Sequence, residues 1–428
     1  MQEVVIVSAA RTPVGAFGGS LKDVTAVDLG SLVIREAVKR AGLRPGLSEE
    51  MKAGEPEPFK GQDKIEIEKA ASDWDEDARE TAFDEVIIGN VLLAGQGQNP
   101  ARQAMIRAGM PKETPAYTVN KVCASGLKAI ALGAASIMCG EAEAIVAGGQ
   151  ESMSCAPMAL PKARWGHRME VTGKGEILDL MVYDGLFEIF YGYHMGVTAE
   201  NIVDTYKISR QEQDELSVLS HNRARKAIAD GTFAKEIVPV TVKTRKGEVI
   251  VDTDERPMET DMEKMAKLKP VFKKDGTVTA GNASGVNDGA AAVVLMSRQR
   301  ADELGIEPLA RIRTFASGGV DPAYMGLGPI PAIRKVLKKS GMSINDFDII
   351  ELNEAFAAQA LACMKELGID TQKPNQYGSG ISLGHPIGCT GARQMVTAVH
   401  MMRDTGAKNG LVSMCIGGGM GMAMIIEV

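Results

Sequence analysis

The sequence has no closely spaced pair of cysteines. Its six cysteines are scattered, and no histidine stands at zinc-finger spacing from any of them. A disulfide framework or a structural zinc site needs such clustered residues, with pairs about two to four residues apart at a zinc site. The spacing therefore argues against both a disulfide-stapled protein and a metal site. The cysteines are Cys123, Cys139, Cys155, Cys363, Cys389 and Cys415.

Basic runs and long unbroken apolar segments are absent as well. The net charge of -7 argues against nucleic acid as a partner. The longest apolar run, Leu411–Ile426, contains glycines and is too short to cross a bilayer, so no membrane partner is expected. No basic region precedes the apolar strand expected at Val4–Ser8, which argues against a signal peptide. These absences predict a cytoplasmic protein in a reducing setting.

What the sequence does contain is ordinary globular composition with alternating elements. Its 428 residues are 45% hydrophobic and 24% charged, enough for two or three domains. Strands are predicted over 3–9, 84–89, 116–120 and 144–147, separated by helices over 26–41, 101–108 and from 123 onward. This alternation favours a mostly parallel sheet covered by helices on both faces.

The same order of elements returns in the second part of the chain, over residues 310–415. DEVIIGN at 84–90 matches DIIELNE at 348–354, and IVAGGQESM at 145–153 matches LVSMCIGGGMGMA at 411–423. We interpret this as an internal duplication, with chance similarity between βα units as the alternative. Two such halves can share one site across a pseudo-twofold axis.

Cys123 lies in the tight turn NKVCASG at 120–126, directly before the helix-favouring run Leu127–Met138. Unpaired backbone N–H groups at a helix start favour a thiolate, which predicts a nucleophile. The alternative is a small buried hydrophobe, since free cysteine is among the most buried residue types. The turn alone leaves both interpretations open.

Two further glycine-rich turns each hold one reactive side chain. His385 lies between Gly384 and Pro386, and Cys415 ends an apolar strand just before three glycines. A lone histidine or cysteine is more often structural. Three reactive residues in three glycine-rich turns favour a shared catalytic site instead.

These motifs resemble those of the thiolase family, and the resemblance covers nearly the whole chain. It is carried in order by VSAARTPVGAFGGSL, IIGNVLLAGQGQNPARQA, NKVCASGLKAI, AGGQESMS, YHMGVTAEN, TAGNASGVNDGAAAV, LNEAFAAQA, GHPIG and CIGGGMG. It implies an α/β fold in which two duplicated βαβαβαββ halves form a five-layer α-β-α-β-α core with an inserted loop domain.

The resemblance also implies the domain boundaries. The N-terminal half covers 1–153 and returns at 288–307, the loop domain covers 154–287, and the C-terminal half covers 308–428. A strongly charged segment at 46–83 departs from the family pattern, and we interpret it as a solvated surface insertion with a helix over 66–80. A regulatory or partner-binding element is its alternative.

The chemistry of the family assigns a role to each reactive residue. Cleaving or condensing a 3-ketoacyl thioester needs a thiolate, a base that moves a proton at carbon, and donors for two oxyanions. By resemblance, Cys123 is the acylated nucleophile, His385 activates it, and Cys415 is the second acid/base. Asn353 would hold a water that stabilises the enolate together with His385. The backbone N–H groups of Cys123 and Gly417 would form the other oxyanion site.

The resemblance further implies the ligands and the assembly. The substrates would be acetyl-CoA, acetoacetyl-CoA and CoA, with no permanently bound cofactor, no metal and a homotetrameric assembly. Residues at family positions near the pantetheine arm or the acyl end are His194, Ser284, Met195, Met325 and Phe356.

The reaction implied is the interconversion of two acetyl-CoA with acetoacetyl-CoA and CoA, through an acetyl-Cys123 intermediate with ping-pong kinetics. A thiolase that acts on longer 3-ketoacyl chains would share every catalytic residue and is the first alternative. A lipid-carrier or scaffold protein on the same fold is the second. The complete reactive set argues against it, because a carrier has no use for a second reactive thiol.

Overall fold

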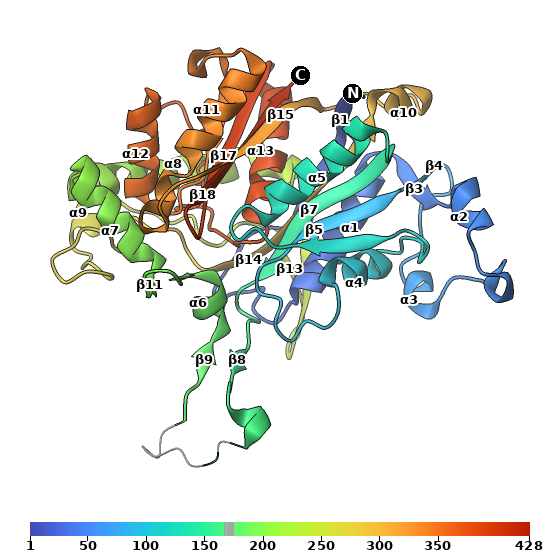
Figure 1. Cartoon of the computed structure of the whole chain (residues 1–428), viewed down its shortest axis with the longest axis horizontal. Helices are drawn as coiled ribbons and strands as arrows, with labels where there is room; N and C mark the ends of the chain where they lie inside the picture. Colours follow the sequence, from blue (N-terminus) through green and yellow to red (C-terminus); the bar gives the residue numbers. More distant parts are fainter. Residues whose placement is uncertain (167, 169–174) are drawn as a thin grey trace.

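The computed structural model describes residues 1–166, 168 and 175–428, so residues 167 and 169–174 of the predicted loop domain lie outside the described residues. The chain forms two similar halves that pack side by side (Figure 1). In the N-terminal half the strand order is β1 (Val4–Arg11), β14 (Asn287–Ser297), β7 (Ala144–Ser152), β5 (Glu85–Gly89) and β6 (Ala116–Val119), with β2 (Gly15–Ala16) beside β14. In the C-terminal half it is β16 (Ile349–Leu352), β17 (Asn409–Ile416), β18 (Met420–Glu427) and β15 (Ala310–Gly319).

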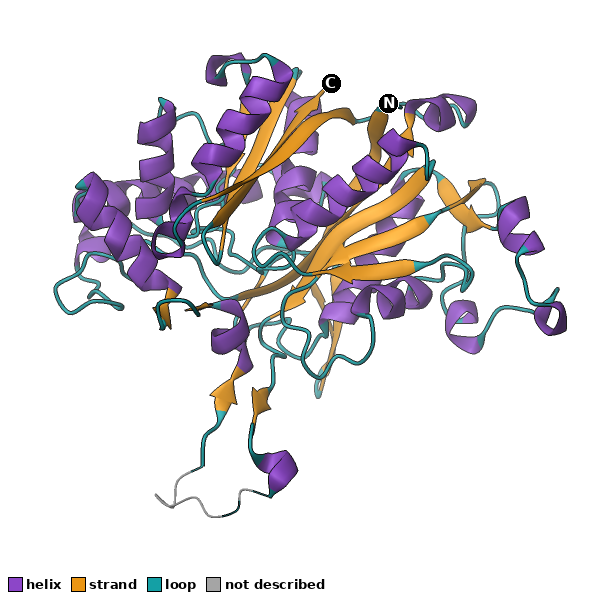
Figure 2. Ribbon diagram, viewed as in Figure 1, coloured by secondary structure: helices purple, strands orange, loops and turns teal. Residues whose placement is uncertain are grey.

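Among the described residues, the two half-sheets are joined where β1 meets β15, through the pairs Val5–Arg311 and Ile6–Ala310. Between the half-sheets lie the two central helices, α5 (Ser125–Cys139) and α13 (Thr390–Thr405), which share one apolar core with both. The outer faces are covered by α1 (Ala26–Arg40) and α4 (Pro100–Arg107) on one side, and by α11 (Pro329–Ser340) and α12 (Ala357–Leu367) on the other. The helices and strands thus stack in five layers, as predicted (Figure 2).

The expectation of a mostly parallel sheet is wrong. Among the named strands, parallel pairing joins β5 to β6, β5 to β7 and β16 to β17 in the large sheet, and its other ladders are antiparallel. The cause is that each half ends on a returning strand. β18 follows β17 through the tight turn Gly417–Gly419, and β14 returns from the inserted region, so both run against their neighbours.

Corresponding hydrogen bonds in the two halves support the internal duplication. Asp84, just before β5, accepts from the backbone N–H groups of Glu143 and Ala144 at the start of β7. Asp348, just before β16, accepts in the same way from Lys408 and Asn409 at the start of β17. The matched sequence motifs therefore occupy equivalent positions.

One segment in the part of the chain that the structure describes, Val122–Cys139, which includes α5, is long and apolar enough to span a bilayer. The apolar window runs over Val122–Cys139 with a mean hydropathy of 1.7, and 56% of it is buried. Its alanine, leucine and isoleucine side chains pack against β7, β14 and α13. The packing accounts for the apolar composition of the window, since this is a core helix.

The inserted region carries short elements around two long helices. The two long helices are α7 (Met195–Tyr206) and α8 (Arg210–Ala229). The shorter elements are β8 (Met158–Ala159), β9 (Leu178–Asp179), α6 (Leu180–Gly185), β10 (Phe187–Glu188), β11 (Tyr193–His194), β12 (Val240–Thr244), β13 (Gly247–Val251) and α9 (Met262–Ala266). α10 (Arg298–Glu303) then follows β14.

A buried ion cluster fastens this region to the N-terminal half. Arg11, at the end of β1, is fully buried and donates to both carboxylate oxygens of Asp254, at 2.7 and 2.9 Å. Its Nε donates to Glu236 at 2.6 Å, and its guanidinium lies 4.8 Å from the Phe233 ring centroid. Removing one partner of such a cluster would leave an uncompensated buried charge.

The charged insertion at 46–83 does not contain the full helix predicted over 66–80, because only Glu66–Lys69 of that range is α-helical. Its elements are β3 (Leu43–Gly46), α2 (Glu49–Ala53), α3 (Glu66–Lys69) and β4 (Arg79–Ala82), with β3 and β4 paired in parallel. Arg35 of α1 holds it in place, since its guanidinium stacks on Trp74 at 4.5 Å and donates to Asp73. The acidic residues of this segment lie in exposed turns. Charged residues in such turns give the same sequence pattern as the exposed face of a helix, so the pattern did not separate the two.

Candidate active site

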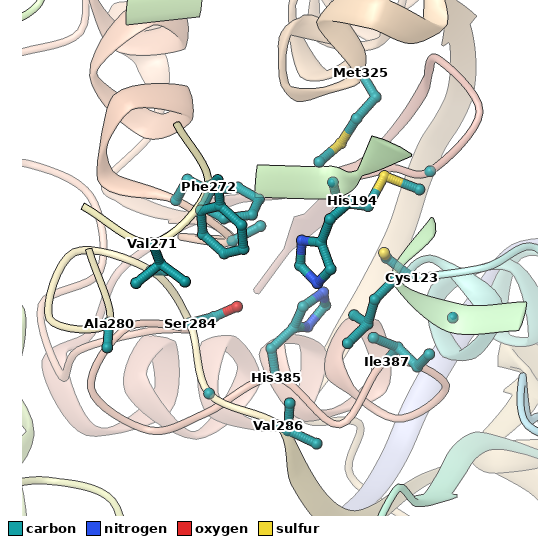
Figure 3. Close-up of a pocket in the computed structure, with 18 of the residues that line it drawn as sticks. Cys123, His194, Val271, Phe272, Ala280, Ser284, Val286, Met325, His385 and Ile387 are labelled. Atoms are coloured by element: carbon teal, nitrogen blue, oxygen red, sulfur yellow. The ribbon is translucent and has the colours of Figure 1, made fainter. Parts of the chain in front are cut away.

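One cavity of about 330 Å³ brings together most of the residues predicted to form the site. It lies where the two halves meet the inserted region, and Figure 3 shows the His385 and His194 rings pointing toward each other beside the Cys123 side chain. The predicted residues that line it are Cys123, His194, Met195, Ser284, Met325, Phe356, His385 and Gly417. Cys415 and Asn353 are not among its lining residues.

Cys123 lies in the turn between β6 and α5 and is 9% exposed. Burial raises the pKa of its thiol to about 11, although the backbone N–H groups of Gly417 and Cys123 itself act in the opposite direction. The expectation that the helix start favours a resting thiolate is therefore wrong, because desolvation outweighs it. The two N–H groups are those predicted to form an oxyanion site, and both act on this sulfur.

His385 is the residue predicted to activate this thiol. It is 5% exposed, and burial, aided by the charge of Arg393, lowers its pKa to about 3, so the ring is neutral at neutral pH. Nδ1 lies 2.6 Å from the Thr390 hydroxyl, which donates to the Pro386 carbonyl at 2.9 Å. The hydroxyl has one proton, so it must accept from Nδ1–H. The tautomer therefore leaves a lone pair on Nε2, which has no partner among the described residues.

This geometry makes Thr390 a testable positioning residue. Replacing Thr390 with valine keeps its shape but leaves Nδ1–H buried without an acceptor, which costs on the order of 1–3 kcal/mol. We expect kcat/KM to fall about tenfold, because the ring loses its fixed tautomer. Thr390→Ser, which keeps the hydroxyl, is the matched control and should retain activity. Equal losses in both variants would show that the methyl group matters instead of the hydrogen bond.

Cys415 ends β17 and is completely buried in an apolar cluster with Met195, Met325 and Phe356. Burial raises the pKa of its thiol well above the ordinary value, and the proximity of Cys123 raises it further. The two thiols predicted to share the reaction are thus neighbours, from opposite halves of the duplicated fold.

Asn353 follows β16 and is fully buried, and neither its Oδ1 nor its Nδ2 has a partner in the described part of the chain. A buried amide is normally hydrogen-bonded, and an unpaired one marks a place for water or a ligand. This agrees with the predicted role of holding a water. Gly380 lies so near that a Cβ there would approach Asn353 Oδ1 to 2.8 Å.

His194 complements His385. Its Nδ1 accepts from the Gly196 backbone N–H at 3.0 Å, so the neutral ring carries its proton on Nε2 and is a donor there. Its ring stacks on Phe272, with centroids 4.7 Å apart, and burial lowers its pKa. The cavity thus has one imidazole that accepts and one that donates.

The predicted set leaves out several residues in and around the site. Arg256 lines the cavity and donates to the carbonyls of Ile381 and Ala283. Phe272 also lines it, and no motif marks that residue. Glu151, in the AGGQES motif, is buried and accepts from the Gly388 backbone N–H at 3.0 Å, which ties the His385 turn to the N-terminal half. The AGGQES motif is the sequence feature from which Glu151 could have been predicted.

The fold and the site define the chain as an acyltransferase of the duplicated five-layer α/β type. Models of the thiolase N-terminal domain match residues 4–74 and 65–299, and the model of the C-terminal domain matches residues 306–428. The chain belongs to the thiolase family. Both halves and the inserted region fall within these matches.

Relatives and solved structures agree over the full length. An acetyl-CoA acetyltransferase from Syntrophomonas wolfei is 52% identical over 428 residues, covering 100% of this chain and 99% of the relative. One from Pseudomonas aeruginosa is 50% identical with the same coverage. The crystal structure of the Bacillus anthracis acetyl-CoA acetyltransferase is 46% identical with a TM-score of 0.88, covering 100% and 99% of the two chains. The 46–83 segment thus lies within the length shared with these proteins.

Proposed function

We propose that the chain is an acetyl-CoA C-acetyltransferase that interconverts two acetyl-CoA with acetoacetyl-CoA and CoA. The observation that carries this is the convergence, in one cavity, of the Cys123 thiol, the free Nε2 of His385 and the N–H groups of Cys123 and Gly417. The names of the relatives support the same reaction.

The first half-reaction acetylates Cys123. His385 Nε2 takes the thiol proton, and the thiolate attacks the carbonyl carbon of acetyl-CoA. The N–H groups of Cys123 and Gly417 stabilise the oxyanion, and the C–S bond to CoA then breaks. Cys415 gives its proton to the departing CoA sulfur, which leaves a Cys415 thiolate beside a protonated His385.

The second half-reaction forms the new carbon–carbon bond. The Cys415 thiolate takes a methyl proton from a second acetyl-CoA, and His385 Nε2–H and a water on Asn353 stabilise the enolate oxygen. The enolate carbon attacks the acetyl-Cys123 carbonyl, and the acetyl–sulfur bond breaks. His385 returns its proton to the Cys123 thiolate, so every group regains its starting state.

Chain length is the property that separates this proposal from a thiolase for longer 3-ketoacyl chains. Met195, Met325 and Phe356 close the acyl end around Cys415 with buried side chains, which favours a short acyl group. Thiolysis of acetoacetyl-CoA should therefore have a higher kcat/KM than thiolysis of longer 3-ketoacyl-CoA substrates. A preference for long chains would establish the alternative activity, and no turnover with any of them would favour a carrier.

We also propose a homotetramer, because a large apolar surface is left uncovered. Figure 1 shows β8 and β9 extending away from the body of the protein. On or beside this arm, large apolar side chains are exposed, namely Met158, Leu160, Trp165 and Ile177. Patches of this kind mark association surfaces. Light scattering would report four chains for the native protein, and a monomer would refute the proposal.

A further inference from the structure

The residue directly before Cys123 has an unusual backbone. Val122 has a φ of 47°, in the left-handed region that β-branched residues avoid. Asn99, Lys207 and Asn375 are the other non-glycine residues with positive φ in the described chain, and none of them is β-branched. Strain of this kind persists only where the surroundings fix the conformation, and it gathers at functional sites.

The turn around Val122 is built to fix that conformation. The Val122 N–H donates to Asn120 Oδ1 at 3.0 Å. The Val122 carbonyl accepts from the Ser125 backbone N–H at 3.0 Å and from the Ser125 hydroxyl at 2.7 Å. The same hydroxyl accepts from the Lys121 N–H at 2.8 Å. Both polar groups of the Val122 backbone are thus satisfied in this strained geometry.

The side chain of Val122 contacts the opposite half of the protein. A Cβ placed on Gly417 would lie 3.2 Å from Val122 Cγ1 and 2.8 Å from Met195 Cε, so both side chains border Gly417 on the side where a Cβ would point. Gly417 is buried and Val122 is half-buried. Val122 is therefore joined by one peptide bond to the Cys123 N–H and by direct packing to the residue that supplies the Gly417 N–H.

We propose that Val122 is a positioning residue for acyl transfer: its left-handed backbone aims the Cys123 N–H, and its β-branched side chain sets the position of the Gly417 N–H. This inference rests on the proposed function, because it assigns Val122 to the oxyanion site of that reaction. It implies that the strain at Val122 aligns two donors from separate halves of the chain. Preorganised donors stabilise an oxyanion strongly, and small misplacements weaken them.

The experiment measures acetylation and alkylation of the same sulfur. Val122→Gly relieves the strain and removes the contact with Gly417. We expect acetylation of Cys123 by acetyl-CoA, followed by mass spectrometry, to slow about tenfold or more. Alkylation by iodoacetamide forms no oxyanion, so its rate should fall much less than that of acetylation, by no more than the change in the thiolate fraction of Cys123. The melting temperature should hold or rise, because a strained residue has been relaxed.

Two variants serve as matched controls. Lys207→Gly relieves the same strain at an exposed position after α7 (φ 53°), so it should leave acetylation unchanged. Val122→Thr keeps the β-branch and should acetylate Cys123 at the wild-type rate. Val122→Ala, which keeps Cβ but loses the packing on Gly417, is the second test should the glycine variant fail to fold, and it should acetylate slowly.

Each outcome decides the matter. Acetylation that slows much more than alkylation does, at unchanged stability, supports the inference. Wild-type acetylation in the glycine and alanine variants overturns it, and so does a parallel loss of acetylation, alkylation and stability, which would mark a purely structural residue. If the wild-type protein itself is not acetylated on Cys123, the proposed function fails, and that result is distinct from either.

Discussion

Cys123→Ala should abolish both half-reactions, whereas Cys415→Ala should still form the acetyl-enzyme. The first variant has no sulfur to carry the acetyl group, and turnover should fall by on the order of 10⁴-fold or more. The second keeps Cys123, His385 and both N–H donors, and CoA can depart as a thiolate without the proton of Cys415, but no group is left to deprotonate the second acetyl-CoA. Its condensation rate should fall by about 10²–10⁴-fold. Mass spectrometry after mixing with acetyl-CoA would show the adduct on the Cys123 peptide.

Cys363 offers a control matched in burial. Its thiol is also completely buried, and it contacts the Gly326 carbonyl at 3.3 Å without lining the cavity. Cys363→Ala should therefore retain both steps. An acetyl adduct missing from Cys415→Ala, together with turnover in Cys123→Ala, would reverse the roles of the two thiols.

The arrangement of the site was largely predictable because it depends on short motifs in glycine-rich turns. Cys123 lies in the turn before α5 and His385 in the turn before α13, which is the counterpart of α5 in the other half. Once the duplication is recognised, the pseudo-symmetry places both turns at the same meeting point of the half-sheets. The residues carried by family motifs therefore reach one cavity or its immediate surroundings.

Properties that depend on the whole fold were not predictable in this way. The ionisation of Cys123 follows from desolvation by every element packed around it, whereas a local motif shows only the helix start. The role of Thr390 needs the second hydrogen bond to the Pro386 carbonyl, which fixes the tautomer of His385. Phe272 reaches the cavity from a loop without regular periodicity, so no sequence pattern marks it.

The direction of strands was missed for a related reason. Alternation of strands and helices predicts parallel crossovers, and it does so correctly for β5, β7 and β6. It carries no information about a strand that returns through a glycine turn, as β18 does. β14 follows the whole inserted region in the sequence, so its direction in the sheet depends on contacts with residues distant in sequence.

The second large effect is expected in acid. Burial lowers the pKa of His385 to about 3 and that of His221 to about 4, from an ordinary value of 6.5. Between its folded pKa and the ordinary value of 6.5, such a histidine is protonated in the unfolded state but mostly neutral in the folded state. The stability that it contributes is complete above pH 6.5 and is lost as the pH falls below it. At pH 5 each loss is about 2 kcal/mol.

Buried carboxyl groups act with the opposite sign, so the wild-type curve alone cannot isolate the histidines. Burial raises the pKa of Glu151 to about 7 and that of Glu351 to about 8. Because their pKa values are higher in the folded state, these groups bind protons more tightly there than in the unfolded state. The stability that they contribute is therefore complete below the unfolded pKa of 4.5 and is lost as the pH rises toward 7 to 8. The two kinds of group therefore oppose each other between pH 5 and 6.5.

Differences between variants remove the carboxyl contribution, since those groups are present in every chain compared. His385→Gln and His221→Gln replace each ring with a neutral side chain that does not titrate. Urea unfolding at pH 7.5 and at pH 5 gives the free energy of unfolding that each protein loses between these two pH values. This loss should be about 4 kcal/mol smaller for the double variant than for the wild type. His400→Gln, at a half-buried histidine that contacts the Ala9 carbonyl, is the control. Parallel loss in the double variant and the wild type would mean that His385 is solvated or charged in the folded state, and His385 would then no longer be the neutral base that the buried thiol of Cys123 requires.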